Sequence, residues 1–264
     1  MTTKSLNISR LLVYPIKSCG PVDVSELECD AMGPIYDRRF MLTKPNGLFL
    51  SQRAHPKLAL VQPSIADGML TLAAPGMSRL SFPLQPPTGD EKPIRIFRTE
   101  SRAKPVAGEA HEWFSTYLSE PVQLVTAVPS ARFYYGTSVA FPDGAQLHLI
   151  TEESLAAVSQ AGDSGYSILN FRPNIVAHGL GDPFVEESIT ALHTDHIRLE
   201  SQGPCERCVI PNVDPQAGRF RDGADILGLL KSLRNTQSSS PTFGVLLKVT
   251  EGNRIRIEDS LTLV

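Results

Sequence analysis

The sequence predicts a mainly β protein with a few helices, of the α+β class. Three observations support this prediction. Many short segments are apolar or alternate apolar with polar residues, turn dipeptides such as Asn46-Gly47 separate them, and few stretches have helical periodicity. Numerous short strands with few helices between them favour a closed or sandwiched β architecture over a doubly wound parallel sheet.

Strands fill most of the first half of the chain. Ile8–Tyr14 is a mostly apolar run that a proline ends, and Val22–Glu28 alternates apolar and polar residues with a period of two. Asn46-Gly47 favours a hairpin between the strands beside it. Pro83–Pro93 is rich in proline, glycine and polar residues, as is typical of a linker or long loop. The strands predicted here are Ile8–Tyr14, Val22–Glu28, Phe40–Thr43, Leu48–Ser51, Leu58–Val61, Met69–Leu72, Ile94–Phe97 and Val122–Val125.

Helices are predicted over Glu109–Leu118, Glu152–Gln160 and Ala224–Leu233. Thr151 is the natural N-cap of the second helix, and the two glutamates that follow it suit the positive end of the helix dipole. The third helix is amphipathic. The strands predicted in this second half are Leu147–Ile150, Ile175–Ala177, Ile189–Leu192, Ile197–Glu200, Val209–Val213, Phe243–Val249 and Arg254–Ile257.

The composition is ordinary for a soluble globular protein. The 264 residues are 41% hydrophobic and 20% charged, enough for one large or two modest domains. A net charge of -3 disfavours nonspecific binding to nucleic acid or anionic membranes. The N-terminus has no apolar signal core, and no apolar run reaches the about 18 residues of a spanning helix. We therefore expect a cytoplasmic protein with four reduced cysteines and no membrane or nucleic-acid partner, and no feature of the sequence specifies an oligomeric state.

The segment Gly203–Pro215 contains two of the four cysteines. Cysteine is both a soft metal ligand and, once ionised, a strong nucleophile. Arg207 beside Cys208 can favour the thiolate electrostatically. The C-x-x-C spacing of Cys205 and Cys208 is equally compatible with two small buried hydrophobic residues, so the spacing alone does not assign a role.

Several common cofactor motifs are missing from the sequence. It contains no phosphate-binding loop, no dinucleotide-binding glycine fingerprint and no H-E-x-x-H pair. The nine-residue gap between Cys19 and Cys29 fits no usual zinc knuckle, and no iron–sulfur, flavin or haem motif is present. Electron-transfer chemistry would therefore need an outside donor.

Three further clusters suit an anionic cofactor: Tyr14–Cys19, Asp37–Phe40 and Asn170–Asn174. The first contains a lysine and a serine at the end of a predicted strand, and each of the others contains arginine. Arginine binds phosphate through two parallel hydrogen bonds, whereas lysine acts as a point charge. Pro173 is expected to keep Arg172 in an extended conformation.

Taken in order, these segments resemble the motifs of the MOSC (molybdenum cofactor sulfurase C-terminal) superfamily with its N-terminal β-barrel region. The later motifs include Thr151–Leu155, Arg207-Cys208, Val213–Pro215 and Pro241–Gly244. Within that superfamily, the chain resembles the YcbX-like proteins and the mitochondrial amidoxime-reducing component. The resemblance divides the chain into an N-terminal β-barrel-like region at residues 1–95 and a MOSC β-barrel domain at 96–264, with the first strands able to pack into the later domain.

The resemblance implies a molybdenum cofactor, molybdopterin-bound molybdenum, with Cys208 as the protein ligand of the metal. It also implies which residues bind the pterin and its phosphate: Lys17, Ser18, Arg38, Arg172, Ser154 and Asn174. Asp214 is a candidate proton donor or pocket organiser, although an Asp-Pro turn also gives it a structural role. The chain departs from the family pattern at Pro211-Asn212, where relatives commonly have two threonines. We expect neither the C-terminal iron–sulfur domain nor the membrane anchor that some relatives carry.

The implied function is a molybdenum-dependent oxidoreductase that reduces N-hydroxylated compounds at the N–O bond. Its partners would be a small N-hydroxylated substrate and a separate electron donor, either a ferredoxin-like protein or a reductase. Two alternatives remain open. The first is a carrier protein, in which Cys208 carries a persulfide or the fold carries the molybdenum cofactor in transit. The second is a β-rich binding module with buried cysteines, which would contain neither metal nor pterin.

Overall fold

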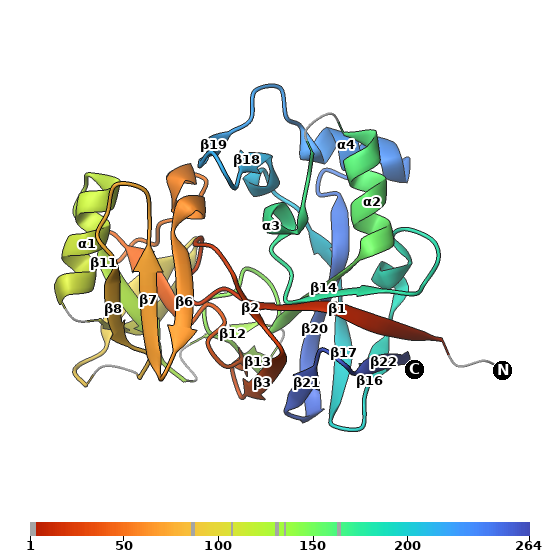
Figure 1. Ribbon diagram of the computed structural model, residues 1–264, viewed down its shortest axis with the longest axis horizontal. Helices are drawn as coiled ribbons and strands as arrows, with labels where there is room; N and C mark the ends of the chain where they lie inside the picture. The colour runs from red at the N-terminus through yellow and green to blue at the C-terminus, as the bar shows by residue number, and fades with distance from the viewer. Residues whose placement is uncertain (1–3, 86–87, 107, 130–131, 135, 163–164) are drawn as a thin grey trace.

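The computed structural model describes residues 4–264 apart from 86–87, 107, 130–131, 135 and 163–164 (Figure 1). Its larger region, at the right of Figure 1, is a β-barrel. Seven strands of the described chain close it, because β1 pairs with β15 as well as with β22. In order around the barrel, these strands are β1 (Ser5–Val13), β15 (Ile175–His178), β14 (Leu147–Thr151), β20 (Thr242–Gly252), β17 (Ile197–Glu206), β16 (Ala191–His193) and β22 (Ser260–Leu263).

Apolar side chains from the strands fill the barrel. Leu11, Leu149, Leu199, Val245 and Leu261 come from five different strands and are almost fully buried. Closure pairs the strand edges, so the polar backbone groups are satisfied within the barrel. The parallel pair of β14 and β15 needs a crossover connection, which a helix supplies. The predicted mainly β, α+β class and its closed β architecture are therefore confirmed.

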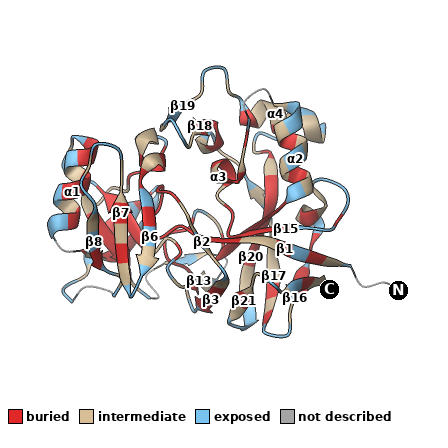
Figure 2. Ribbon diagram, viewed as in Figure 1, coloured by how far each residue is buried: buried red, intermediate tan, exposed pale blue. Residues whose placement is uncertain are grey.

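The smaller region lies at the left of Figure 1. One of its sheets contains β5 (Phe40–Thr43), β11 (Gln123–Ala127), β10 (Thr99–Pro105) and β9 (Lys92–Ile96). The other contains β6 (Gln62–Ala66), β7 (Met69–Ala73) and β8 (Leu80–Pro83). Helix α1 (Gly108–Leu118) packs with them around a core that includes Phe40, Leu70 and Phe114. Figure 2 shows buried residues along the strands of both regions.

The N-terminal segment connects the two regions. Strand β1 belongs to the barrel and β2 (Val22–Val24) pairs beside it. Strand β3 (Glu26–Asp30) then pairs with β21 (Arg254–Arg256) near the C-terminus and with β4 (Gly33–Pro34). The predicted domain boundary after residue 95 falls inside β9, whose sheet continues through β10 to β11. This sheet therefore extends across residue 95, and the division of the chain into domains at that residue remains a prediction.

Helices α2 (Glu152–Ala161) and α4 (Ile226–Arg234) lie together at one end of the barrel, with the short α3 (Ile168–Phe171) beside them. The Thr151 hydroxyl accepts a hydrogen bond from the backbone N–H of Ser154 at 3.3 Å, so the predicted N-cap of α2 is confirmed. Two short hairpins complete the fold: β12 (Phe133–Tyr134) with β13 (Thr137–Ser138), and β18 (Val213–Asp214) with β19 (Arg219–Phe220).

Some sequence predictions were wrong in detail. Most of Leu58–Val61 belongs to a 3-10 helix, Pro56–Leu60, and most of Val209–Val213 to another, Ile210–Asn212. In both segments a proline in the first turn fixes φ and lacks the N–H that a sheet ladder needs. Strand β10 was not predicted, because its sequence TESRAKP is polar and half exposed.

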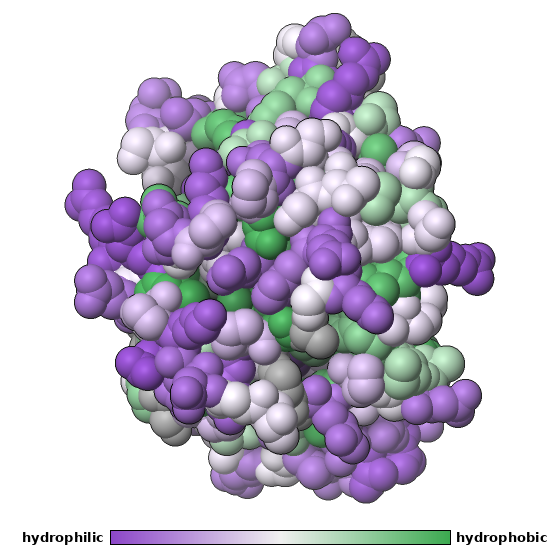
Figure 3. Space-filling view, turned by 90° about the vertical axis from the view of Figure 1, so that its left-hand side faces the viewer, coloured by the Kyte–Doolittle hydropathy of each residue, from purple (hydrophilic) through white to green (hydrophobic). Residues whose placement is uncertain are grey.

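Among the described residues, no helix combines the length and apolar character needed to cross a lipid bilayer. The face that carries the smaller region is turned toward the viewer in Figure 3. Hydrophilic side chains cover most of that face, and hydrophobic ones form separate patches between them.

Candidate functional site

The principal cavity encloses about 530 Å³ and takes lining residues from both regions. The barrel supplies residues from the ends of several strands, and the smaller region supplies Arg53 and Phe97. Six of the sequence-predicted site residues line it: Lys17, Ser18, Arg38, Arg172, Asn174 and Cys208. The chain therefore brings together groups that are far apart in sequence.

Lys17 lies in the wall of this cavity and is 4% exposed. Its ammonium group donates a hydrogen bond to the carbonyl oxygen of Phe141 at 2.9 Å and forms an ion pair with Asp143. Burial lowers the pKa of Lys17, and the neighbouring carboxylate opposes that shift. Partial loss of hydration raises the pKa of Asp143, but the charge of Lys17 outweighs it and lowers the value to about 2. Asp143 is therefore ionised at neutral pH and gives the buried Lys17 a counter-charge.

Two guanidinium groups lie over the ring of Tyr14, at 4.4 Å for Arg38 and 4.3 Å for Arg172. Arg38 donates to both carboxylate oxygens of Asp37, at 2.9 and 2.8 Å. Burial lowers the pKa of Arg38, but the charge of Asp37 outweighs this effect and the net shift is upward. Arg38 is thus neutralised by its own neighbour in sequence.

Arg172 is less completely paired than Arg38. Its Nη1 donates to the carbonyl oxygen of Cys19 at 2.7 Å, whereas its buried Nη2 has no hydrogen-bond partner among the described residues. Burial, followed by the charge of Arg38, lowers the pKa of Arg172 to about 10. A buried N–H group without a partner is costly, and an anionic ligand would satisfy it.

The backbone at the cavity has left-handed residues that are not glycine. Ser18, Arg38 and Arg172 have φ values of 75°, 45° and 58°. Such conformations cost about 1–3 kcal/mol each and persist where the surrounding fold enforces them. The expectation that Pro173 keeps Arg172 extended was wrong, because Arg172 ends α3 as a left-handed C-cap and donates its backbone N–H to the carbonyl oxygen of Ile168. The fold around these residues therefore fixes the shape of the cavity wall.

Cys205 lies on β17 and Cys208 in the loop that follows, and both are free and half-buried. The guanidinium of Arg207 donates to Cys205 Sγ at 3.1 Å, so the structure places this charge against Cys205 rather than Cys208 as the sequence predicted. Partial burial raises the pKa of the Cys205 thiol, and Arg207 opposes that shift. The buried Nε of Arg207 has no partner within the described part of the chain.

Asn174 and His148 support the cavity wall. Asn174 Oδ1 accepts from the backbone N–H of His148 and from Arg38 Nη1, both at 3.2 Å, and its Nδ2 donates to Leu12 at 3.1 Å. His148 is 7% exposed, and its Nε2 donates to the carbonyl oxygen of Phe243 at 3.1 Å. Burial and then the charge of Arg207 lower the pKa of His148 to about 3, so it is neutral. Asn174 thus orients Arg38 and links β1 to β14.

Two predicted site residues lie outside the cavity lining. Ser154 is fully buried, and its hydroxyl donates to Glu186 at 2.8 Å and accepts from the backbone N–H of Phe184 at 2.6 Å. Asp214 accepts from the backbone N–H groups of Gln216 and Ala217, at 2.8 and 3.0 Å. These hydrogen bonds, that of Ala217 first, lower the pKa of Asp214. The contacts of Ser154 are therefore typical of the start of a helix, α2, and those of Asp214 are typical of a turn.

Sequence reasoning assigned no role to Asp143 or His148, which line the cavity. Asp143 stands between proline and glycine, a pattern typical of a turn, and His148 lies within the predicted strand Leu147–Ile150. Neither pattern reveals that the chain folds these residues toward Lys17 and Arg207. For Arg207 the sequence did give an indication of a role, because this residue directly precedes Cys208.

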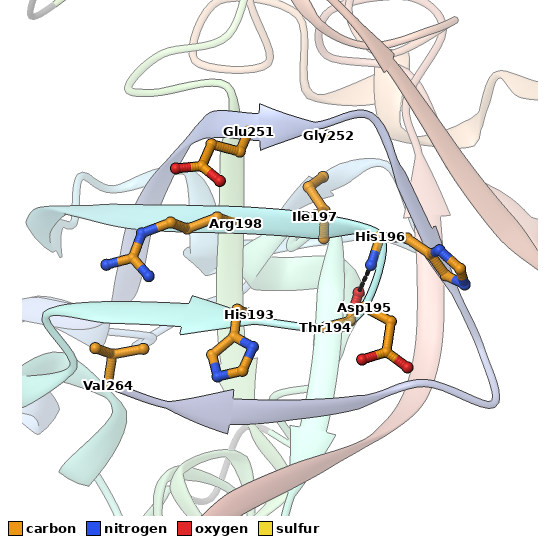
Figure 4. Close-up of a pocket in the computed structure, with 9 residues that line it drawn as sticks. All are labelled: His193, Thr194, Asp195, His196, Ile197, Arg198, Glu251, Gly252 and Val264. Atoms are coloured by element: carbon orange, nitrogen blue, oxygen red, sulfur yellow. Dashed lines mark hydrogen bonds between the residues drawn. The ribbon is translucent and has the colours of Figure 1, made fainter.

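A second cavity, of about 450 Å³, lies beside the turn between β16 and β17 (Figure 4). The side chains that line it diverge, and His193 and His196 point in different directions. The hydrogen bond drawn among them runs from the backbone N–H of His196 to the hydroxyl of Thr194 at 3.0 Å. Throughout the described chain, no three His, Cys, Asp or Glu side chains gather as a metal site. The principal cavity is therefore the candidate functional site.

Comparison with known proteins agrees with this architecture. The family model for the MOSC N-terminal beta barrel domain matches residues 5–121, and that for the MOSC domain matches residues 136–262. The rat mitochondrial amidoxime reducing component 2 is 31% identical over 96% of this chain and 81% of its own length. The human component 2 is 30% identical over 96% of this chain and 82% of its own. The chain therefore belongs to the MOSC family that includes the mitochondrial amidoxime-reducing components.

Proposed function

We propose that the protein is a molybdenum cofactor-dependent reductase of N-hydroxylated compounds. The supporting observation is that one cavity contains a thiol on a loop, Cys208, together with buried guanidinium N–H groups on Arg172 and Arg207 that have no partner in the described part of the chain. Relatives named amidoxime-reducing components support the reaction class. When bound, the cofactor would supply the two-electron reduction of N–OH to N–H, with two protons consumed and water released.

The residues of the cavity fit an anionic pterin cofactor. Lys17, Arg38 and Arg172 would hold its phosphate, and the free Nη2 of Arg172 can donate to it directly. Ser18 Oγ accepts from the backbone N–H of Gln52 at 3.3 Å, which leaves the hydroxyl proton free to donate. Each of these groups would bind or orient the cofactor. The backbone that holds the groups would therefore determine where the cofactor lies.

Cys208 would supply the single protein ligand of the metal, because a thiolate suits a soft metal centre. The neighbouring Cys205 already accepts a hydrogen bond from Arg207, which leaves Cys208 as the less engaged thiol of the pair. His148 donates its Nε2 proton to Phe243 and therefore acts as a neutral wall residue rather than a proton donor.

The test is metal and pterin analysis of protein expressed in a host that makes the cofactor, followed by an activity assay. Loaded protein should reduce a hydroxylaminopurine or an amidoxime with a strong artificial reductant or a ferredoxin-like partner. NADH alone should give no turnover, since we propose that electrons come from a separate donor protein. Robust NADH-driven turnover by the isolated chain would contradict the proposed electron route.

The same experiment separates the alternatives. Protein that contains molybdopterin but reduces no N-hydroxylated compound with any reductant would support a carrier of the cofactor or of persulfide. Well-folded protein that contains neither metal nor pterin would support a binding module instead.

A further inference from the structure

Two glutamines of the described chain, Gln52 and Gln146, are almost fully buried, and each is 4% exposed. Gln146 is held by hydrogen bonds at both ends of its carboxamide. Its Nε2 donates to the carbonyl oxygens of Ala31 and Ser138, at 3.0 and 3.3 Å. Its Oε1 accepts from the backbone N–H of Val249 at 2.9 Å. These are the contacts of a structural residue, because a buried carboxamide normally has partners.

Gln52 lacks such contacts. Its backbone N–H donates to Ser18 Oγ at 3.3 Å, but its carboxamide forms no hydrogen bond with any residue that the structure describes. The side chain lines the principal cavity. A buried polar group without a partner costs free energy, and a ligand in the cavity would supply the missing hydrogen bonds.

A turn at residues 51–55 directs Gln52 toward the principal cavity. The carbonyl oxygen of Ser51 accepts backbone hydrogen bonds from Ala54 and His55, at 3.1 and 3.0 Å, which fix the shape of this turn. Ser51, Ala54 and His55 line a separate, smaller cavity of about 360 Å³, whereas Gln52 does not line it. The hydrogen bond to Ser18 holds the backbone of Gln52 at the candidate site.

The chemistry of a carboxamide differs from that of the cations in the same cavity. Lys17, Arg38 and Arg172 carry positive charge and suit a phosphate. A carboxamide is uncharged and has both N–H donors and an acceptor oxygen. A phosphate would use only the donors, whereas a ring with adjacent N–H and C=O groups would use the donor and the acceptor together. The pyrimidinone ring of a pterin has such an edge.

We propose that Gln52 binds the pyrimidinone edge of the cofactor's pterin through its carboxamide. This inference rests on the proposed function and adds to it a cofactor-binding residue in the smaller region. Arg172 at the barrel would hold the charged phosphate, and Gln52 would hold the uncharged ring. Both regions would therefore contribute to cofactor binding.

Gln52→Met and Gln146→Met test this assignment. Methionine is also unbranched, but it donates no hydrogen bond and is only a weak acceptor. Without cofactor, Gln52→Met should melt at the temperature of the parent protein or above it, whereas Gln146→Met should melt lower, because only Gln146 loses hydrogen bonds that the fold makes. After expression in a host that makes the cofactor, Gln52→Met should release pterin on dilution about tenfold faster than the parent. Gln146→Met should release it at the parent rate.

Equal rates of pterin release from Gln52→Met and the parent would overturn the assignment. Destabilisation of cofactor-free Gln52→Met to the extent seen in Gln146→Met would also overturn it, because Gln52 would then have a structural role. Inorganic phosphate is the second probe and should bind cofactor-free Gln52→Met as it binds the parent. Weaker phosphate binding in this variant would place Gln52 at the phosphate rather than at the ring, and the assignment would be wrong.

Pterin release separates this inference from the proposed reaction, because the measurement needs no turnover. If the loaded parent reduces no N-hydroxylated compound but Gln52→Met releases pterin faster, the role of Gln52 stands and the proposed reaction fails. If the loaded parent is an active reductase and Gln52→Met retains pterin equally well, the role of Gln52 fails and the reaction stands. A parent protein that contains no pterin would overturn both.

Discussion

Two polar cavities beside the barrel differ in how their charged groups are held. In the principal cavity, Lys17 is buried, a buried N–H group of Arg172 has no partner among the described residues, and four lining residues other than glycine have left-handed backbone. In the cavity beside the β16–β17 turn, His193, Asp195 and His196 are exposed and diverge (Figure 4). The second cavity is nearly as large, so volume does not separate them.

The two cavities differ in the free-energy cost of their polar groups that lack a hydrogen-bond partner. Water satisfies an exposed histidine or aspartate at little cost, whereas a buried guanidinium loses hydration that only a partner can replace. Unsatisfied buried polarity therefore identifies a binding site better than the mere presence of charged residues.

The largest expected effect is at Cys208. Cys208→Ser replaces a soft ligand by a hard, poorly ionised hydroxyl and should abolish reductase activity. Cys205→Ser should keep most of the activity, because serine can still accept the hydrogen bond from Arg207. Activity assays and thermal melts of both variants test this difference. Equal loss of activity with parallel loss of stability would show that the two thiols have a shared structural role, and the metal assignment of Cys208 would then be wrong.

The next effect is at Arg172. Arg172→Ala should weaken cofactor binding by about 1.5–3 kcal/mol, the value of a charge-assisted contact in a partly buried site. Arg172→Lys should recover only part of this, since the planar fork is lost. The measurement is molybdopterin content per folded chain. Arg198→Ala at the second cavity is the control and should leave that content unchanged.

Arg172→Gly separates the guanidinium from the backbone. Glycine accepts a φ of 58° without strain, whereas alanine does not. The glycine variant should therefore be more stable than the alanine variant by about 1 kcal/mol, yet equally poor in cofactor. Full cofactor content in either variant would contradict the placement of Arg172 at the phosphate.

The sequence indicated much of the barrel and part of the site, for identifiable reasons. Apolar runs such as Phe243–Val249 predict a strand because burial on both faces needs little more than hydrophobicity, and the structure contains β20 there. Lys17, Arg38 and Arg172 could be proposed from local motifs. The partners that determine their charge state could not, since Asp143 is brought to Lys17 only by the tertiary fold. The same holds for the stacking of both arginines on Tyr14.

The smallest effect concerns acid stability and compares His148 with His193. The folded-state pKa of His148 is lowered to about 3, below the about 6.5 of an unfolded chain. The unfolded state therefore binds more protons below about pH 6.5, so stability is fully present above that pH and is lost as the pH falls toward 3. Between about pH 7 and pH 5.5, the loss should be about 1 kcal/mol in the free energy of unfolding.

His148→Gln tests this origin of the acid sensitivity. Glutamine can still donate a hydrogen bond to Phe243 but does not titrate, so its free energy of unfolding should fall less steeply between about pH 7 and pH 5.5. Urea titrations at several pH values measure the difference. His193→Gln in the second cavity should leave the pH profile of the parent protein unchanged, because His193 is exposed. Equal changes in the two variants would mean that burial in the principal cavity does not keep His148 neutral. The proposed difference in hydration between the two cavities would then be wrong for this histidine.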